Sequence, residues 1–408
     1  MLSQFTVKNY KSIRDEMTFD MQATAISEHG AHLIMDSDDE SFLPIAAVYG
    51  PNGGGKSNVL EAMQVLVAKV IRPLFVTINV PEQEDALKKL PVVPFAFSKN
   101  SKNEPTEFEI FFRTESSEYR YIIHVQNEKV LYEQLDRVKK ETSRRSALFV
   151  RKKDEIELKG VLGSLKIGEG VSNSIPLLSY LGITYGENKV IKEIIEWFVN
   201  GITFLNYGNP FQEALIAVAG AEDAKRLVLK MIKEMDLDID DFRIEKQENG
   251  RIEVYTKHII DENEVEIKLS EESSGTRKVF GLLPYVARSI LGGSTLVIDE
   301  LDAKIHPLLL RYIIELFSDH EKNRYGAQLI FTSHDLSTMN NEVFRRDEIW
   351  FVAKGNDQNT KLYSLVEFKN DKGETVRKDA KYDKQYLEGK YGADPYLQKI
   401  IDWSEPNA

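Results

Sequence analysis

One stretch of the chain has the residue types and spacing that bind phosphate. Residues 50–57, Gly-Pro-Asn-Gly-Gly-Gly-Lys-Ser, match the pattern G-x-x-x-x-G-K-[ST] at every fixed position. Glycines let the backbone aim several N–H groups at phosphate oxygens, and a helix that starts here adds the positive end of its dipole. We expect Lys56 to reach the β- and γ-phosphates and Ser57 to offer its hydroxyl to Mg²⁺. The predicted nucleotide-binding residues are Asn52, Gly53, Gly54, Gly55, Lys56, Ser57 and Asn58.

The residues on either side place this loop between a strand and a helix. Residues 42–49 form a short apolar segment that suits a buried strand, and residues 58–63 have the composition of a helix. A turn that merely resembles the motif is the alternative interpretation. The strand-loop-helix context favours a working phosphate loop over it.

A second apolar run, residues 294–298, leads into two carboxylates, Asp299 and Glu300. Such a run is typical of a buried parallel strand, and its end resembles a Walker B motif. Asp299 is predicted to hold Mg²⁺ through water, and Glu300 to orient and deprotonate the water that attacks the γ-phosphate. Neighbouring residues of a strand point to opposite faces, so we expect the two acids to have separate tasks. Without the phosphate loop, this pattern would often be an ordinary surface edge.

A third apolar run, residues 329–333, is followed by His334. The distance in sequence from Glu300 is about one helix and one strand, as expected for the neighbouring strand of a phosphate-loop sheet. A histidine at a strand end is usually structural. Here we favour a switch role for His334 at the γ-phosphate.

A fourth segment, residues 269–277, places small residues before a helix-compatible run, residues 279–283. It begins about 25 residues before Asp299, and it predicts a second helix start that can bind an anion. The residues at this start are Ser273, Ser274 and Gly275.

The order of these motifs resembles the SMC/RecF-like branch of the ABC ATPases. More narrowly, residues 5–12, 272–277 and 299–307 resemble the single-chain AAA ATPases of bacterial anti-phage operons. The resemblance continues through residues 347–352 and 386–393, so it covers nearly the whole chain. It implies that Ser273, Ser274 and Gly275 contact the γ-phosphate of a nucleotide held by a second subunit, and that Asp302 lies at the dimer seam.

The sequence also departs from the ABC pattern. The signature lacks the paired glycines and the Gln or Glu that are common in ABC proteins, and it has Ser274 and Thr276 instead. This puts the strength of the contacts between subunits in doubt. The glutamine that usually links Mg²⁺ to the insertion has two candidates, Gln126 and Gln134.

The predicted fold class is α/β, a P-loop NTPase of ABC ATPase-like type with an antiparallel β-rich first lobe and an inserted helical subdomain. Alternating β-branched and aromatic residues from 92 to about 153 predict an antiparallel meander, and helical spacing prevails from about 176 to 235. The predicted units are an ATPase lobe with the phosphate loop and meander (1–170), a helical insertion (171–235), an ATPase lobe with the signature, Walker B and histidine (236–369), and an appendage (370–408).

The composition of the chain excludes several kinds of site chemistry. The 408 residues include no cysteine, which excludes disulfides, thiolate-bound metals and a thiol nucleophile. The chain begins without the pattern of a signal peptide and has no apolar run of about 18 residues, so we expect a cytoplasmic protein without membrane contact. A net charge of -12 argues against a general nucleic-acid coat but leaves room for a local basic groove.

Two charged segments give weaker indications of function. A basic region around residues 139–153 could bind nucleic acid or an acidic partner, although two solvated strand ends around a turn are favoured. An acidic run at residues 236–241 has some metal-ligand spacing. It lacks the turn glycine and closing glutamate of a calcium loop, so a solvated lead-in to a strand is favoured.

The first functional hypothesis is an ATP-hydrolysing switch that uses ATP and Mg²⁺ and forms a homodimer, or a higher oligomer, around the nucleotide. By the family resemblance, it acts as a sensor or regulator of a separately encoded nuclease or toxin effector in anti-phage defence. The alternative is a RecF-like DNA-repair ATPase that binds duplex DNA. A transporter subunit is disfavoured, because the long β-rich first lobe and the signature depart from that pattern.

Overall fold

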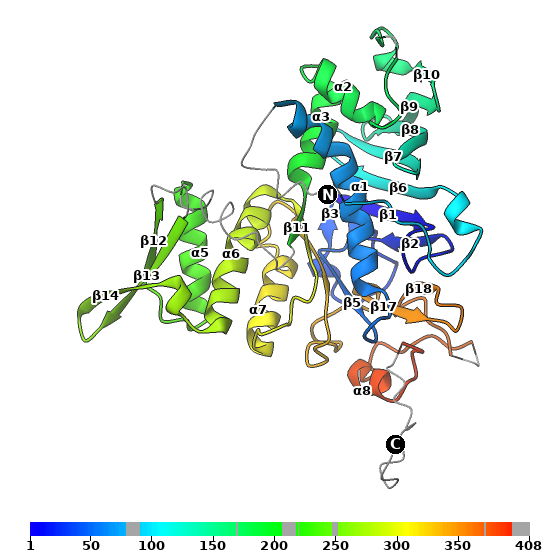
Figure 1. Cartoon of the computed structure of the whole chain (residues 1–408). Coiled ribbons are helices and arrows are strands. Elements are labelled where there is room, and N and C mark those ends of the chain that lie inside the picture. Colours follow the sequence, from blue (N-terminus) through cyan, green and yellow to red (C-terminus); the bar gives the residue numbers. More distant parts are fainter. Residues whose placement is uncertain are drawn as a thin grey trace, which may run out of the picture.

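The computed structural model describes residues 1–78, 90–168, 170–205, 218, 220–246, 252–370 and 373–393. Its central sheet has the strand order β11-β15-β16-β5-β17-β18, in which only the last pair is antiparallel. The strands are β5 (Ile45–Tyr49), β11 (Ile202–Leu205), β15 (Thr295–Ile298), β16 (Gln328–Thr332), β17 (Ile349–Lys354) and β18 (Thr360–Ser364). Figure 1 shows this sheet in the middle of the molecule.

The central sheet separates two apolar cores, and β5 shows how. Ala46 and Val48 face a core that contains one face of helix α1 (Lys56–Ile78), whereas Ile45, Ala47 and Tyr49 face a core with helices α6 (Ser274–Gly292) and α7 (Pro307–Ser318). All of β5, β15 and β16 is buried, as expected for parallel strands covered on both faces. The continuous apolar runs of the sequence therefore predicted these strands correctly.

A second, antiparallel sheet packs on the α1 side, with the order β10-β9-β8-β7-β6-β1-β2. It confirms the predicted antiparallel meander, and β1 and β2 add a hairpin to it. The strands are β1 (Leu2–Lys8), β2 (Met17–Asp20), β6 (Thr106–Arg113), β7 (Ser117–Gln126), β8 (Lys129–Lys139), β9 (Arg144–Lys152) and β10 (Glu155–Leu158). Its buried and half-buried residues alternate along β6 and β7, the pattern of a sheet with one covered face.

Two smaller sheets complete the strands. The hairpin of β3 (Ile34–Met35) and β4 (Ser41–Phe42) precedes β5, and a three-stranded sheet is formed by β12 (Asp241–Lys246), β13 (Ile252–Ile260) and β14 (Asn263–Lys268). In Figure 1 the three-stranded sheet lies beside α5 (Glu222–Glu234) at the end of the molecule away from the antiparallel sheet. Short 3₁₀ turns cover Gly30–His32, Ser101–Asn103, Gly160–Leu162, Leu269–Glu271 and Arg346–Glu348, and a π turn covers Trp197–Gly201.

The segment predicted as a helical insertion contains α2 (Leu177–Tyr185), α3 (Lys189–Glu196) and α5. It also contains strand β11, which pairs in parallel with β15 in the central sheet. Helix α2 starts at a buried carboxylate, since Glu133 of β8 accepts the N–H groups of Leu177 (2.6 Å) and Leu178 (2.9 Å). A negative charge at a helix N-terminus is favourable. The insertion is therefore bonded to both large sheets.

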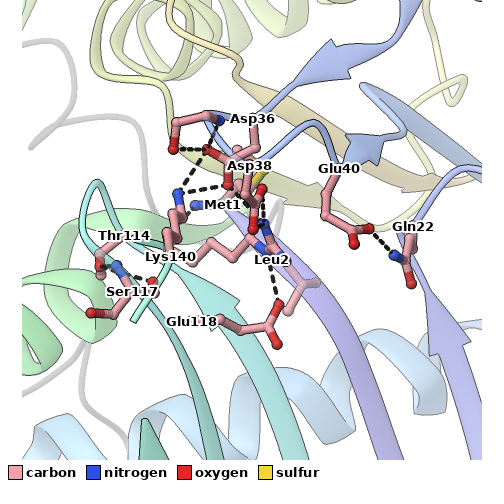
Figure 2. A network of polar contacts seen from close by, with 12 residues as sticks. Met1, Leu2, Gln22, Asp36, Asp38, Glu40, Thr114, Ser117, Glu118 and Lys140 are labelled. Carbon is pink, nitrogen blue, oxygen red and sulfur yellow. Dashed lines mark hydrogen bonds and ion pairs between the residues drawn. The ribbon is translucent and has the colours of Figure 1, made fainter. Parts of the chain in front are cut away.

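A cluster of charges ties the β3–β4 hairpin to the end of the antiparallel sheet. Arg113 donates to Asp36 (3.1 Å), Asp38 (2.7 Å) and Glu118 (2.7 Å), and Lys140 contacts Asp36 at 2.6 Å. Figure 2 shows Asp36, Asp38 and Lys140 converging there. The paired charges hold this hairpin, and so the segment leading into β5, against the sheet.

Part of the predicted appendage packs into the core. Helix α8 (Tyr382–Leu387) brings Tyr386 to a stacked contact with Phe351 of β17, with 5.6 Å between the ring centroids. Tyr391 is also buried, and its carbonyl accepts the hydroxyl of Tyr363. Side chains of residues 373–393 therefore join the core on the α6 and α7 side of the central sheet. Residues 394–408 lie outside the described residues.

Candidate nucleotide site at the carboxyl edge of the central sheet

Three strands bring the predicted motifs to one edge. β16 pairs in parallel with both β5 and β15, with Thr332 opposite Val48 and Phe331 opposite Ile298. The carboxyl ends of adjacent parallel strands meet at the same edge, where α/β sheets bind their ligands. The phosphate loop, the two acids after β15 and His334 after β16 therefore lie along this edge.

The phosphate loop has a backbone that its glycines require. Gly55 has φ +108°, and a Cβ there would lie 2.3 Å from the hydroxyl oxygen of Thr360. At Gly50 a Cβ would lie 2.5 Å from the carbonyl oxygen of Val352, so β17 leaves no room for a side chain. Both positions demand glycine because the loop passes close to strands β17 and β18.

Lys56 begins helix α1, and its ammonium lies within the loop. Its Nζ donates to the carbonyls of Gly50 (2.8 Å) and Pro51 (3.2 Å), and its side chain is buried. Burial lowers the pKa of Lys56, while Asp299 and Asp302 act in the opposite direction. A buried ammonium bonded only to carbonyl dipoles is a strong attractor for phosphate oxygens, which fits the predicted role.

Three side chains outside the phosphate-loop motif are hydrogen-bonded next to the loop: the hydroxyls of Thr360 and Ser12 and the amide of Asn58. Thr360 donates to the carbonyl of Gly54 (3.0 Å) and contacts Ser12 Oγ (2.8 Å), which also accepts from the amide of Asn58 (2.7 Å). Asn58 therefore supports the loop, and its direct contact with the nucleotide stays a prediction. Ser12 belongs to the N-terminal motif noted in the sequence.

Ser57 and Asp299, the two predicted Mg²⁺ ligands, line one cavity of about 170 Å³. One oxygen of Asp299 accepts the hydroxyl of Thr332 at 2.6 Å. Among the described residues no cluster of three or more acidic or histidine side chains could hold a metal by itself. Mg²⁺ is usually held by one or two protein groups together with water and phosphate, so the residues present fit this ion.

The position of Glu300 differs from the sequence prediction, which placed the two acids on a strand. Strand β15 ends at Ile298, so neither acid lies on the strand, and Glu300 has a left-handed φ of +52°. The alternation of a strand therefore does not set the directions of the two carboxylates. The N–H of Glu300 donates to Thr332 Oγ1 at 2.7 Å. Thr332 therefore bonds to both acids, a role that depends on the pairing of β15 with β16.

The signature segment forms the helix start that the sequence predicts. Ser273 caps α6, and its hydroxyl oxygen accepts the N–H of Thr276 at 3.1 Å. Ser273 and Ser274 are exposed. A Cβ added to Gly275 would meet nothing closer than the carbonyl oxygen of Lys304, at 3.6 Å. Packing within the chain therefore does not require glycine at this position.

His334 is exposed at the end of β16, and its backbone N–H donates to Asp302 Oδ2 at 3.1 Å. The other oxygen of Asp302 is buried and has no hydrogen-bond partner among the described residues. Asp302 thus links the histidine loop to the loop after β15.

The remaining sequence candidates lie away from this edge. Gln126 donates to the carbonyl of Asn103 (2.7 Å), and Gln134 donates to Asp136 (2.9 Å), both in the antiparallel sheet. The structure gives neither a contact with the phosphate loop, and the choice between them stays open.

Three of the seven basic side chains in the region of residues 139–153 bond to other parts of the fold, whereas Lys139, Arg144, Lys152 and Lys153 are exposed. Arg151 is fully buried and donates to the carbonyls of Lys153, Ile175 and Val171, while Lys140 and Arg145 pair with carboxylates. These side chains hold segments of the fold together, which weakens the interpretation of this region as a nucleic-acid surface. In the acidic run, Asp240 accepts the N–H of Ile259 in strand β13 at 2.9 Å.

The fold is that of a P-loop NTPase of the ABC ATPase-like type. The chain belongs to the family described as "AAA domain, putative AbiEii toxin, Type IV TA system", whose model matches residues 45–163 and 206–340. No curated protein is similar enough in sequence to match the chain.

Solved structures similar to this chain include heads of SMC proteins. One is an Smc head bound to the C-winged helix domain of ScpA, which is 14% identical, with 89% of this chain and 97% of that chain covered and a TM-score of 0.48. Another is the SMC head domain from Thermotoga maritima, which is 15% identical, with 89% and 98% covered and a TM-score of 0.38. Among the described residues, no helix is both long and apolar enough to cross a membrane.

Proposed function

We propose that this chain binds and hydrolyses ATP, and that two copies close around the nucleotide. The observation that carries the proposal is the arrangement at the carboxyl edge of the central sheet. Ser57 and Asp299 share one cavity, the Lys56 ammonium lies in the phosphate loop, and Glu300 follows Asp299 in the turn after β15.

Within one copy, the residues divide the work of hydrolysis. The amides of the phosphate loop and Lys56 bind the β- and γ-phosphates, and Ser57 and Asp299 hold Mg²⁺. Mg²⁺ supplies positive charge that offsets the charge developing on the phosphate oxygens. Glu300 accepts the proton of the attacking water, and His334 donates a hydrogen bond to the γ-phosphate.

The signature helix supports a role for a second copy. Ser273, Ser274 and Gly275 lie at an exposed helix start, whose N–H groups favour an anion. Glycine lowers helix stability, and no contact within the chain requires it at position 275. Close approach of a nucleotide from another molecule explains this residue choice.

Binding and turnover test the cis half of the proposal. Lys56→Ala removes the ammonium and should abolish measurable ATP binding by isothermal titration and all ATPase activity, whereas Glu300→Gln should keep binding and lose turnover by about 10²-fold or more. The unfolding temperature of each variant serves as the folding control. Wild-type turnover in the Lys56→Ala protein would overturn the assignment of this site.

The biological setting is the final step of the proposal. The family description names a putative toxin of a toxin-antitoxin system, which supports a setting in defence. That the chain regulates a separately encoded nuclease or toxin effector in anti-phage defence is what the family resemblance implies. On this account the ATP state of the dimer holds or releases the effector. A nuclease or toxin gene beside this one would support the setting, and co-purification of its product with the Glu300→Gln protein would test it.

A further inference from the structure

The loop after β15 is bonded to three elements that surround the candidate site. Thr332 of β16 accepts the N–H of Glu300, and the N–H of His334 donates to Asp302. From the third side, Lys278 of α6 donates to the carbonyl oxygen of Glu300 at 3.3 Å and to that of Ala303. This loop therefore joins the Walker B strand, the histidine loop and the signature helix.

Lys278 is well placed to connect the signature to the loop. It lies four residues after Ser274 in α6, about one helical turn, so both residues are on the same face of the helix. Ser274, Lys278 and Glu300 all line one cavity of about 640 Å³ between α6, the three-stranded sheet and the loop. Ser274 of the signature and Glu300 therefore both belong to the lining of this cavity.

The backbone of Glu300 needs this kind of support. Its left-handed φ of +52° is unfavourable for a residue with a side chain, and such conformations persist where surrounding contacts hold them. Thr332 holds the N–H of Glu300 and Lys278 holds its carbonyl, so the residue is fixed on both sides. Burial lowers the pKa of Lys278 to about 8, consistent with an ammonium that has exchanged water for carbonyl oxygens.

We propose that Lys278 is a positioning residue that fixes the backbone of Glu300 to the signature helix of the same chain. Contact of Ser274 with the nucleotide of a second copy then sets the direction of the Glu300 carboxylate in this copy. The inference rests on the proposed function, because it concerns the same hydrolysis reaction. It adds a route by which occupation of one nucleotide site controls turnover at the other.

Substitution at position 278 tests the role directly. Lys278→Met keeps most of the side-chain length and removes the ammonium. We expect kcat for ATP to fall by about 10²-fold, the effect of misplacing a catalytic group, with KM and the Kd for ATP changed less than about threefold. Lys278→Arg retains a cation that can reach the carbonyls and should recover a large part of kcat. Arg288→Met, which removes a cation near the other end of α6, is the matched control and should leave kcat unchanged.

A double variant separates positioning from a general structural effect. If Lys278 acts through Glu300, then Lys278→Met should cost almost nothing more in a Glu300→Gln background, as coupled residues are not additive. Additive losses, or a Lys278→Met protein as active as the wild type, would overturn the inference. A wild type with no turnover would overturn the proposed function and this inference together, whereas activity that requires Lys56 but not Lys278 would overturn the inference alone.

Discussion

At the residue scale, the hydroxyl of Thr332 donates to Asp299 at 2.6 Å and accepts from the N–H of Glu300 at 2.7 Å. Sequence motifs identify both acids because their types and order are diagnostic. Thr332 could not be predicted, since its role comes from the register of β16 beside β15, which no local pattern encodes. The same holds for Lys278, whose contacts are with carbonyls more than 20 residues away.

Glu348, at the turn before β17, gives a prediction about pH. It is fully buried, and one of its carboxylate oxygens accepts the N–H of Arg345 at 2.8 Å. The other oxygen has no hydrogen-bond partner among the described residues. Burial raises the pKa of Glu348 from 4.5 to about 8. The folded state therefore holds this proton more tightly than the unfolded chain does.

The sign of the effect follows from that difference. The contribution of Glu348 to stability is complete below pH 4.5 and is lost as the pH rises through about 8. Glu348→Gln keeps the shape and the acceptor but cannot ionise. Urea unfolding should show the wild type losing a few kcal/mol more than this variant between those pH values. Parallel stability curves for the two proteins would contradict the prediction.

At the element scale, the phosphate loop depends on segments from both ends of the described chain. Ser12 follows β1, Thr360 begins β18, and the hydroxyls of the two residues meet under Gly54. The strand-loop-helix unit itself was predictable, because its apolar run and glycine spacing are local. The strand β11 inside the predicted helical insertion was not, because its four residues become a strand only by pairing with β15. Likewise, the packing of α8 on Phe351 depends on tertiary contact.

Thr360→Val tests the support of the loop. Valine has nearly the same shape but cannot donate to the carbonyl of Gly54 or bond to Ser12. Losing about 1–1.5 kcal/mol of hydrogen bonding at the loop should raise the Kd for ATP about tenfold and leave kcat at saturating ATP nearly unchanged. Thr295→Val, which removes the hydroxyl of a buried threonine at the amino end of β15, is the control. An unchanged Kd in Thr360→Val would show that the loop holds its shape without this contact.

At the scale of the whole molecule, the two halves of the proposed site lie on different parts of one chain. The phosphate loop leads into α1, whereas the signature starts α6, which packs on the opposite face of the central sheet. On the proposed function, the exposed helix start and Gly275 complete the nucleotide site of a second copy. The family resemblance of the sequence implies contact between two copies. No local sequence pattern indicates how tightly two copies associate.

The mass of the Glu300→Gln protein in solution, measured by size-exclusion light scattering with and without Mg-ATP, tests this account most directly. We predict a dimer only with Mg-ATP, because the uncleaved γ-phosphate is bound by both copies. Adding Gly275→Val should abolish the dimer while leaving ATP binding intact, since that residue lies outside the phosphate loop of its own copy. A Glu300→Gln protein that binds ATP and stays a monomer would contradict the account.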